Sequence, residues 1–212
     1  MEDMRKQYTR SGLAESDCHS NPIEQFRNWF DEMVQHNPVD WFEPNAMTLA
    51  TADQDGNLAA RIVLLKGFDE SGFVFYTNYE SAKGKELAAN PKASLAFYWP
   101  FMERQVRIDG SVQKVSREQS DKYFHLRPRG SQLGAVVSPQ SQVLASRAEL
   151  ETKVAELEQQ LAGQTVSLPD HWGGYVVYPT QIEFWQGREN RLHDRIQYIR
   201  SGDGWKLQRL AP

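Results

Sequence analysis

Cysteine is almost absent from the sequence, because the 212 residues include a single one, Cys18. One cysteine excludes an intrachain disulfide, and the chain has neither a CxxC pair nor histidine and cysteine clustered at zinc-binding spacing. We therefore expect no metal site. The shortage of cysteine also fits a reducing compartment, so we predict a cytoplasmic protein.

Long hydrophobic runs and a surplus of positive charge are lacking as well. No segment is apolar over the length needed to cross a bilayer, and the start, MEDMRKQYTRSGLAESD, lacks the apolar core of a signal peptide. The formal net charge is -4, with 24 Lys and Arg against 28 Asp and Glu. Such scattered charge argues against binding to nucleic acid or to a membrane, but it leaves local anion sites open.

Several catalytic motifs are missing too. The chain contains neither GxGxxG nor GxxxxGK[ST], which removes the standard nicotinamide and nucleotide-triphosphate folds. His193 is followed by Asp194, but neighbours on a strand point to opposite faces, so no Ser-His-Asp relay can be inferred. Hydrolase chemistry is unsupported.

What is present is the composition of an ordinary globular protein, with 40% hydrophobic and 25% charged residues. Residues 1–20 are polar, lack periodicity and resemble a mobile N-terminal arm. We expect residues 21–212 to form one domain, since the length suits a single core.

Capping signals predict three main helices. Asn21, Pro22 and Glu24 open the first, Ser116 and Gln119 open a second that stops near Leu126, and Ser146 and Glu149 open a third that ends at Gly163. Between the second and third we expect a loop, and SAKGKELAANP reads as a short helical piece. Short β-rich runs separated by tight turns fill most of the remainder, namely MTLATA, LAARIVLLKGF, FVFYTN, ASLAFYW, RQVRIDGSVQKV, GGYVVYPTQIEFWQG, RLHDRIQYIR and WKLQRLAP. About seven antiparallel strands with few helices predict a small barrel with peripheral helices.

Cations line up in RLHDR near the C-terminus. At a strand's period of two, Arg191, His193 and Arg195 share one face, an unfavourable arrangement unless an anion lies in front of it. Trp185 shares their phase, which is typical either of a surface cation–π pair or of one wall of an aromatic ligand's pocket.

Two further groups could hold phosphate. Arg61 and Lys66 flank four aliphatic residues and should point to opposite faces of a strand, while Thr77 and Lys83 lie beside the start of a short helix. The simpler alternative is a buried strand with charged ends followed by a capped surface helix.

A third cluster joins Tyr123, Arg127 and Ser131 at a helix end, where two hydroxyls and a guanidinium suit a phosphate monoester. Taken alone, a half-buried tyrosine and an arginine that pairs with the helix dipole would explain it. Gln140 and Ser141 add uncharged donors in a polar loop. Together the clusters indicate two phosphate sites around an aromatic group.

These residues resemble a known family. RIVLLK, FYTN, ERQV, YFHLRPRGSQLGAVVSPQS, EFWQG, RLHDR and the terminal RLAP are similar, in order, to motifs of the pyridoxamine 5′-phosphate oxidase family. The resemblance spans nearly the whole chain and implies a split β-barrel homodimer with FMN at the subunit interface. It implies oxidation of pyridoxamine 5′-phosphate and pyridoxine 5′-phosphate to pyridoxal 5′-phosphate by dioxygen, with release of hydrogen peroxide and, from the amine, ammonia, in vitamin B6 biosynthesis or salvage.

The resemblance also assigns roles to residues. It implies a cofactor site made of Arg61, Ile62, Val63, Leu64, Lys66, Tyr76, Thr77, Lys83, Gln105, Gln140, Ser141, Trp185 and Arg195. It implies that the substrate phosphate is held by Lys66, Tyr123, Arg127 and Ser131, that Arg191 and His193 lie against the substrate ring, and that Arg5 and Tyr8 belong to an arm that closes over it. The chain departs from the family at Ala82, where many members have an arginine for the FMN phosphate.

Two alternatives stay open at this point. One is another FMN split-barrel oxidoreductase with a different reductant, and the other is a non-catalytic carrier of pyridoxal phosphate. The predicted site for the substrate phosphate, made of Lys66, Tyr123, Arg127 and Ser131, argues against the first alternative. An intact flavin site together with RLHDR argues against the second.

Overall fold

The computed structural model describes residues 7–212, so that Arg5, one of the predicted site residues, lies outside the described part. The helices are α1 (Pro22–Gln35), α2 (Ala82–Ala89), α3 (Arg117–Leu126), α4 (Arg129–Val137) and α5 (Arg147–Leu161), with short 3₁₀ turns η1 (Glu15–Asp17) and η2 (Glu189–Arg191). The strands are β1 (Ala46–Ala52), β2 (Leu58–Leu64), β3 (Gly67–Asp69), β4 (Gly72–Asn78), β5 (Lys92–Trp99), β6 (Arg104–Lys114), β7 (Trp172–Gln186), β8 (Asp194–Ser201) and β9 (Gly204–Leu210).

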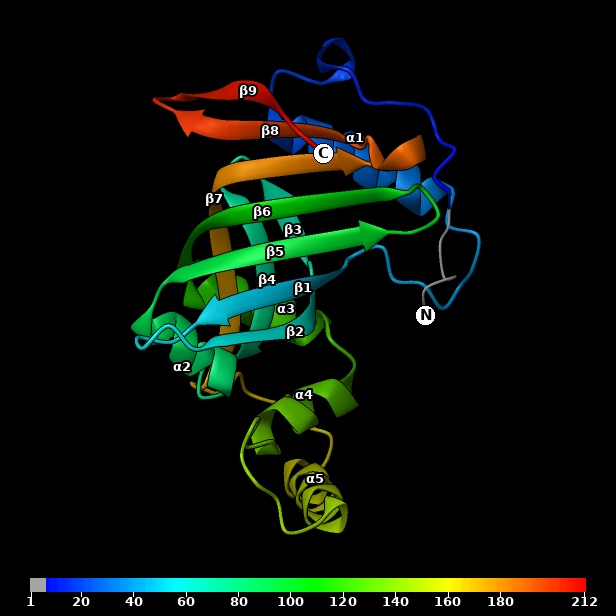
Figure 1. Ribbon diagram of the computed structural model, residues 1–212. Helices are drawn as coiled ribbons and strands as arrows, with labels where there is room; N and C mark the ends of the chain where they lie inside the picture. Colours follow the sequence, from blue (N-terminus) through cyan, green and yellow to red (C-terminus); the bar gives the residue numbers. More distant parts are fainter. Residues whose placement is uncertain (1–6) are drawn as a thin grey trace.

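The strands form one nine-stranded sheet in the order β2-β1-β5-β6-β7-β4-β3, with β8 and β9 continuing from β7 on a separate branch. Every pairing is antiparallel. The sheet curves into a half-barrel, with α1 behind its upper part and α4 and α5 together at its lower end (Figure 1).

Strand β7 creates the branch. Its first half pairs with β4 as far as Val177, and its second half pairs with β8 from Gln181 onward. Pro179 lies between the halves, opposite a register shift at Asp109 and Gly110 of β6. Proline has no backbone N–H to offer to a ladder and is tolerated at such bulges, so the strand changes partners at this position.

Helix α1 fills the concave side of the half-barrel. The Asn21 side chain accepts a hydrogen bond from the backbone N–H of Ile23 at 2.8 Å, which caps the helix. Phe26 is fully buried, and its ring lies 5.0 Å from Phe73 and 5.1 Å from Phe97, both on strands. The main core is therefore aromatic and is closed by a single amphipathic helix.

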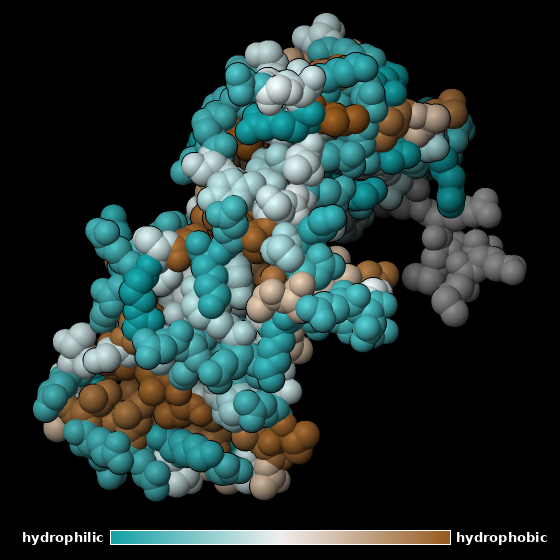
Figure 2. Space-filling model, turned by 90° about the vertical axis from the view of Figure 1, so that its left-hand side faces the viewer, coloured by the Kyte–Doolittle hydropathy of each residue, from teal (hydrophilic) through white to brown (hydrophobic). Residues whose placement is uncertain are grey.

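A smaller hydrophobic core lies at the lower end of the molecule, where α3, α4 and α5 pack together. Its buried members are Phe124, Leu133, Val166, Leu168 and Trp172. The predicted stripe of α5 contributes Val154, Leu157 and Leu161, which pack against this core but stay half-exposed. Figure 2 shows hydrophobic surface in this lower part of the molecule.

The predicted fold class is confirmed: the chain is a mainly antiparallel half-barrel with peripheral helices. The three predicted helices are present, at residues 22–35, 117–126 and 147–161, and the third turns at Ala162 in a left-handed conformation, one residue before the predicted end at Gly163. The strand count of about seven was too low, and the expected loop after Leu126 contains α4. Pro128 is the N-cap of this helix, but Gly130 and Gly134 within it weaken the sequence signal.

The division into an arm of residues 1–20 and a domain of residues 21–212 stays a prediction. In the part of the chain that the structure describes, no helix combines the length and the apolar character needed to cross a membrane. Within that same part, no three His, Cys, Asp or Glu side chains lie together as metal ligands would.

Candidate active site

A cavity of about 470 Å³ opens beside strand β2, between β4, α3 and α4. Most residues predicted for the cofactor and for the substrate phosphate meet here. Those that line it are Arg61, Ile62, Val63, Leu64, Lys66, Tyr76, Thr77, Lys83, Tyr123, Arg127, Ser131 and Gln140. Residues from five separate segments of the sequence therefore share one hollow.

Strand β2 contributes a free edge to this cavity. It pairs with β1 along its length, and among the described strands it has no second partner, so half of its backbone N–H and C=O groups remain available to a ligand. The strand ends at Leu64, and the backbone N–H of Lys66 donates to the carbonyl of Val74 at 2.8 Å. The prediction that Arg61 and Lys66 point to opposite faces was therefore wrong: Lys66 lies beyond the strand, and both cations line the same cavity.

Arg61 has a carboxylate partner that the sequence reasoning missed. Its Nη2 lies 2.9 Å from Glu86 Oε2, and its Nη1 donates to the hydroxyl of Thr51. Glu86 lies on α2 three residues after Lys83, a spacing that places the two side chains on neighbouring parts of one helix face. This spacing is the sequence feature that could have placed Glu86 beside the predicted phosphate site. The pair fixes the guanidinium before any ligand binds.

Lys83 is surrounded by neutral oxygens. Its Nζ lies 3.2 Å from Thr77 Oγ1, 3.4 Å from Ser81 Oγ and 3.0 Å from Gln140 Oε1. Burial lowers the pKa of Lys83, and the positive charge of Arg61 lowers it further. Two half-buried cations that repel one another are stabilised by an anion placed between them.

Arg127 offers the clearest unused donor. Its Nη1 is buried and has no hydrogen-bond partner among the described residues. The guanidinium stacks 4.7 Å from the ring of Trp172, and burial lowers its pKa. Tyr123 stacks on Tyr76 at 4.0 Å beside it. A buried guanidinium without an acceptor is costly, and a phosphate oxygen would satisfy it.

Gln105, Trp185, Arg195, His193 and Tyr8 lie elsewhere, around the second half of β7 and the start of β8. Gln105 pairs with Trp185, and Trp185 pairs with Arg195, so the three form a row on one face of β6, β7 and β8. The ring of His193 lies 4.6 Å from Trp185, and the ring of Tyr8 lies 5.5 Å from each of them. None of these five residues lines the cavity beside β2.

Arg195 is held by a second carboxylate that the sequence reasoning missed. Its Nε and Nη2 lie 2.8 Å and 3.1 Å from the two oxygens of Glu183, which is only 4% exposed. This two-point hydrogen bond raises the pKa of Arg195. Glu183 is two residues before Trp185 and so shares its face of the strand, which was the signal.

The predicted strand through Arg191, His193 and Arg195 was partly wrong. Residues 189–191 form the turn η2, in which Asn190 and Arg191 have left-handed φ values of 55° and 62°, and β8 begins at Asp194. Only Arg195 belongs to a strand. Arg191 is exposed on the turn, and its charge acts on His193.

The tautomer of His193 follows from its neighbour. The backbone N–H of Arg188 donates to His193 Nδ1 at 3.0 Å, so Nδ1 is unprotonated and the ring proton is on Nε2. Partial burial lowers the pKa of His193, and the charge of Arg191 adds to this shift. The imidazole is therefore neutral at pH 7 and presents an N–H donor.

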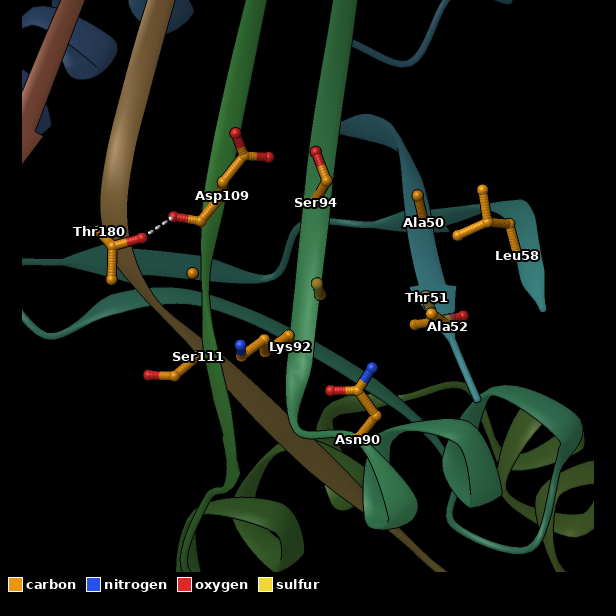
Figure 3. A pocket seen from close by; sticks show the side chains of 12 residues that line it. Ala50, Thr51, Ala52, Leu58, Asn90, Lys92, Ser94, Asp109, Ser111 and Thr180 are labelled. Atoms are coloured by element: carbon orange, nitrogen blue, oxygen red, sulfur yellow. Dashed lines mark hydrogen bonds between the residues drawn. The ribbon is translucent and has the colours of Figure 1, made fainter. Parts of the chain in front are cut away.

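Ser141 does not line the cavity beside β2, and a second cavity lies on another part of the sheet. Ser141 is exposed and adopts a left-handed φ of 71° directly after Gln140, outside the lining of the cavity beside β2. A second cavity of about 510 Å³ lies on the sheet over β1, β5 and β6 (Figure 3), lined by small and polar side chains such as Ser94, Lys92 and Thr180. It includes none of the predicted site residues, so its size does not mark it as the active site.

Comparison with known proteins identifies the family. Residues 36–161 match the family model described as pyridoxamine 5′-phosphate oxidase, and residues 172–212 match the model described as the pyridoxine 5′-phosphate oxidase C-terminal dimerisation region, which indicates a homodimer. The chain is 57% identical over 212 residues to the pyridoxine/pyridoxamine 5′-phosphate oxidase of Pseudomonas paraeruginosa, covering 99% of this chain and 97% of the relative. It is also 57% identical to the protein of that name from Thermosynechococcus vestitus, over 99% of this chain and 98% of the relative.

Solved structures agree with these relatives. PhzG from Burkholderia lata, in complex with tetrahydrophenazine-1-carboxylic acid, superposes with a TM-score of 0.89 at 30% identity, covering 98% of this chain and 100% of that one. A pyridoxamine 5′-phosphate oxidase-related FMN-binding protein from Nostoc punctiforme has a TM-score of 0.70 at 18% identity, covering 88% of this chain and 97% of that one, which supports the split-barrel fold alone. The chain belongs to the pyridoxamine 5′-phosphate oxidase family and is an oxidoreductase of that family.

Proposed function

We propose that this protein oxidises pyridoxamine 5′-phosphate and pyridoxine 5′-phosphate to pyridoxal 5′-phosphate in vitamin B6 biosynthesis or salvage, with FMN as cofactor and dioxygen as the final acceptor. The observation that carries the proposal is the cavity beside β2, where four cations surround stacked aromatic rings and the Nη1 of Arg127 has no partner among the described residues. The names and identities of the relatives support the same reaction.

The residues of the cavity fit FMN. Arg61 and Lys83 supply positive charge for its phosphate, Thr77 and Gln140 supply hydrogen-bonding groups, and the free edge of β2 offers backbone groups to a flat heteroaromatic ring. Ala82, at the first position of α2, adds no charge, so Arg61 and Lys83 must hold this phosphate without a neighbouring arginine. When bound, FMN supplies the acceptor for a hydride from the exocyclic carbon of the substrate and passes the electrons to dioxygen, which gives hydrogen peroxide.

The substrate phosphate belongs to a second part of the cavity. Lys66, Tyr123, Arg127 and Ser131 converge there, and a phosphate monoester has enough acceptor oxygens to satisfy all of them. Held by this remote group, the pyridine ring is fixed in position for reaction, because binding energy away from the reacting carbon is used for orientation.

The second cluster completes the site from another copy of the chain. Trp185 and Arg195 would contact the cofactor, while Arg191, His193 and Tyr8 would cover the substrate ring. Their separation from the cavity within one chain and the dimerisation region at residues 172–212 both support a composite site with FMN at the subunit interface. His193 would donate its Nε2 proton to the ring or move a proton, and Arg195 would stabilise negative charge that the cofactor gains.

The test begins with the visible spectrum of the purified protein. Adding pyridoxamine 5′-phosphate in air should then yield aldehyde, ammonia and peroxide in equal amounts, with catalase and a sample stripped of cofactor as controls. A colourless protein that binds pyridoxal 5′-phosphate without oxidising its precursors would instead indicate a carrier.

A cytoplasmic location remains a prediction from composition.

A second candidate substrate comes from the PhzG relative, whose structure holds tetrahydrophenazine-1-carboxylic acid. That ligand carries a carboxylate and no phosphate, and it would leave part of the donor set around Arg127 unsatisfied. We therefore expect kcat/KM for pyridoxamine 5′-phosphate to exceed that for a tetrahydrophenazine carboxylate by more than about a hundredfold. A reversed preference would replace our proposal with the second reaction.

A further inference from the structure

Glu103 occupies an unfavourable position in the turn between β5 and β6. It is 5% exposed, and its φ of 54° is left-handed, a conformation that favours glycine or asparagine. Burial of a carboxylate and a left-handed backbone are both costly. An acidic residue at this position therefore indicates a specific partner.

The partner is the backbone of the N-terminal segment. Glu103 Oε2 accepts hydrogen bonds from the N–H of Thr9 at 2.9 Å and from the N–H of Arg10 at 3.1 Å. The Arg10 side chain adds a contact, since its Nη2 donates to the carbonyl of Phe101 at 2.8 Å. One carboxylate thus binds a stretch of chain more than ninety residues away in sequence.

The turn that carries Glu103 is itself fixed to the end of β7. The N–H of Gly187 donates to the Glu103 carbonyl at 2.8 Å, and the side chain of Gln186 donates to the carbonyls of Met102 and Glu103 at 3.1 Å and 3.2 Å. Gln186 and Gly187 directly follow Trp185. The backbone of the turn is therefore fixed to the strand end next to Trp185.

Tyr8 precedes the two anchored residues. Its ring stands edge-on to Trp185 and to His193, at 5.5 Å from each, and a Cβ on Gly187 would lie 2.7 Å from it. Farther along, Asp194 Oδ2 accepts from the N–H of Leu13 at 3.0 Å, a second carboxylate that binds the same segment. The segment is thereby attached on both sides of residues 11 and 12.

We propose that Glu103 is a positioning residue that latches residues 9 and 10 of the N-terminal segment to the β5–β6 turn, and thereby holds Tyr8 over the part of the site where the substrate ring binds. Glu103 itself contacts neither substrate nor cofactor. The position of Tyr8 over a substrate ring rests on the proposed function, whereas the latch rests on the contacts of residues 8–10.

Limited proteolysis tests the latch without reference to activity. Trypsin cleaves after Arg10, and a docked segment is cleaved slowly. We expect Glu103→Ala to speed this cleavage about tenfold and Glu103→Gln, which keeps one acceptor oxygen, about threefold. Glu156→Gln, a change at an exposed glutamate on α5, is the matched control and should leave the rate as in the wild type. Equal rates in all four proteins would overturn the latch.

Kinetics tests the positioning role. In the holoenzyme we expect Glu103→Ala to raise KM for pyridoxamine 5′-phosphate about tenfold and Glu103→Gln about threefold, with kcat and bound FMN changed less than about twofold. An unchanged KM, or loss of FMN in place of a KM effect, would overturn the role.

A change on the opposite side of the contact guards against misfolding of the turn. Thr9→Pro removes one donated N–H and leaves Glu103 in place, and Ser11→Pro alters an N–H that bonds to no residue in the described part. We expect Thr9→Pro to raise KM severalfold, with little added by Glu103→Gln, and Ser11→Pro to have a smaller effect. Additive effects of Thr9→Pro and Glu103→Gln would show that the two residues act independently and would contradict the latch. If the wild type oxidises neither substrate, the proposed function fails while proteolysis still decides the latch.

Discussion

Arg127 holds its guanidinium in a half-buried position against Trp172, with Nη1 lacking an acceptor among residues 7–212. We expect Arg127→Ala to raise KM for pyridoxamine 5′-phosphate by about tenfold to a hundredfold, because a charged hydrogen bond to phosphate is lost. Steady-state kinetics with the FMN content measured in the same samples checks this.

Arg147→Ala, at an exposed position near the start of α5, controls for loss of positive charge in general. If Arg127→Ala lowered FMN content and left KM unchanged, the assignment of Arg127 to the substrate phosphate would be wrong.

Arg191 and His193 are coupled by charge. Burial is the main cause of the lowered pKa of His193, and Arg191 is the next. We expect Arg191→Ala to raise the pKa of His193 toward the ordinary value of 6.5, since protonation no longer meets a neighbouring cation. NMR titration of the imidazole measures this, and turnover should fall by more than about tenfold while FMN stays bound.

The lowered pKa of His193 also makes the stability of the folded protein depend on pH. The unfolded chain binds the proton at a higher pH than the folded chain does, so the contribution of His193 to stability is fully present above about pH 6.5 and declines as the pH falls. In Arg191→Ala this decline should become shallower. A His193 pKa that did not move, or fell, in this variant would show that Arg191 lies too far away to act on it.

At the level of elements, α2 depends on a glycine for its position. A Cβ on Gly84 would lie 2.2 Å from the carbonyl oxygen of Tyr79, a backbone atom that cannot move away cheaply. We expect Gly84→Ala to lower the free energy of unfolding by about 1–3 kcal/mol and to weaken FMN retention, because Lys83 and Glu86 lie on the displaced helix. Denaturant unfolding and the flavin absorbance of the dialysed protein are the measurements.

Gly134→Ala is the matched control, since nothing lies within 4 Å of its added methyl group and it sits inside α4. There we expect a gain of up to about 1 kcal/mol from helix propensity. A loss of stability at Gly134 equal to that at Gly84 would contradict the role of the Tyr79 contact.

Local sequence signals predicted some of the helices and strands and missed others. The caps at Asn21, Ser116 and Ser146 predicted three helices because a cap is decided by residues within one turn. The strand expected through Arg191 failed because its backbone turns left-handed at residues 190 and 191, which an alternation of side chains does not reveal. Helix α4 was missed for the related reason that its glycines imitate a loop.

For the whole molecule, the predicted site residues divide into two groups that one chain does not bring together. If each active site takes Arg127 from one subunit and Arg191 from the other, an Arg127→Ala chain can still supply Arg191, and an Arg191→Ala chain can still supply Arg127. We expect a mixture of the two, unfolded and refolded together, to regain about a quarter of wild-type activity, since half of the dimers are mixed and each mixed dimer has one intact site.

Each variant refolded alone is the control, with subunit exchange followed by a tag on one variant. A mixture no more active than its components would place both groups of residues in one subunit's site.

The motifs named most of the residues that line the cavity beside β2, whereas they did not name the carboxylates that hold the neighbouring cations. Glu86, Glu183 and Glu103 lie far in sequence from the groups they hold, apart from short-range hints at Lys83 and Trp185. Such pairs form only when strands and helices distant in sequence pack together, so spacing places Glu86 and Glu183 on a shared face with a predicted residue but does not identify the arginine that each one binds. The placement of Gln105 beside Trp185 likewise depends on the register between β6 and β7.

The anchoring of the N-terminal segment by Glu103 and Asp194 has a consequence for how freely this segment can change during evolution. Both carboxylates bind main-chain N–H groups of Thr9, Arg10 and Leu13, which every amino acid except proline possesses. The identity of Thr9 is therefore nearly free to drift. At Gly12 an added Cβ would lie 1.9 Å from Nη1 of Arg188, the far end of a flexible and partly exposed side chain that can move away at little cost. Saturation mutagenesis of residue 9 should thus find a position that rejects little besides proline.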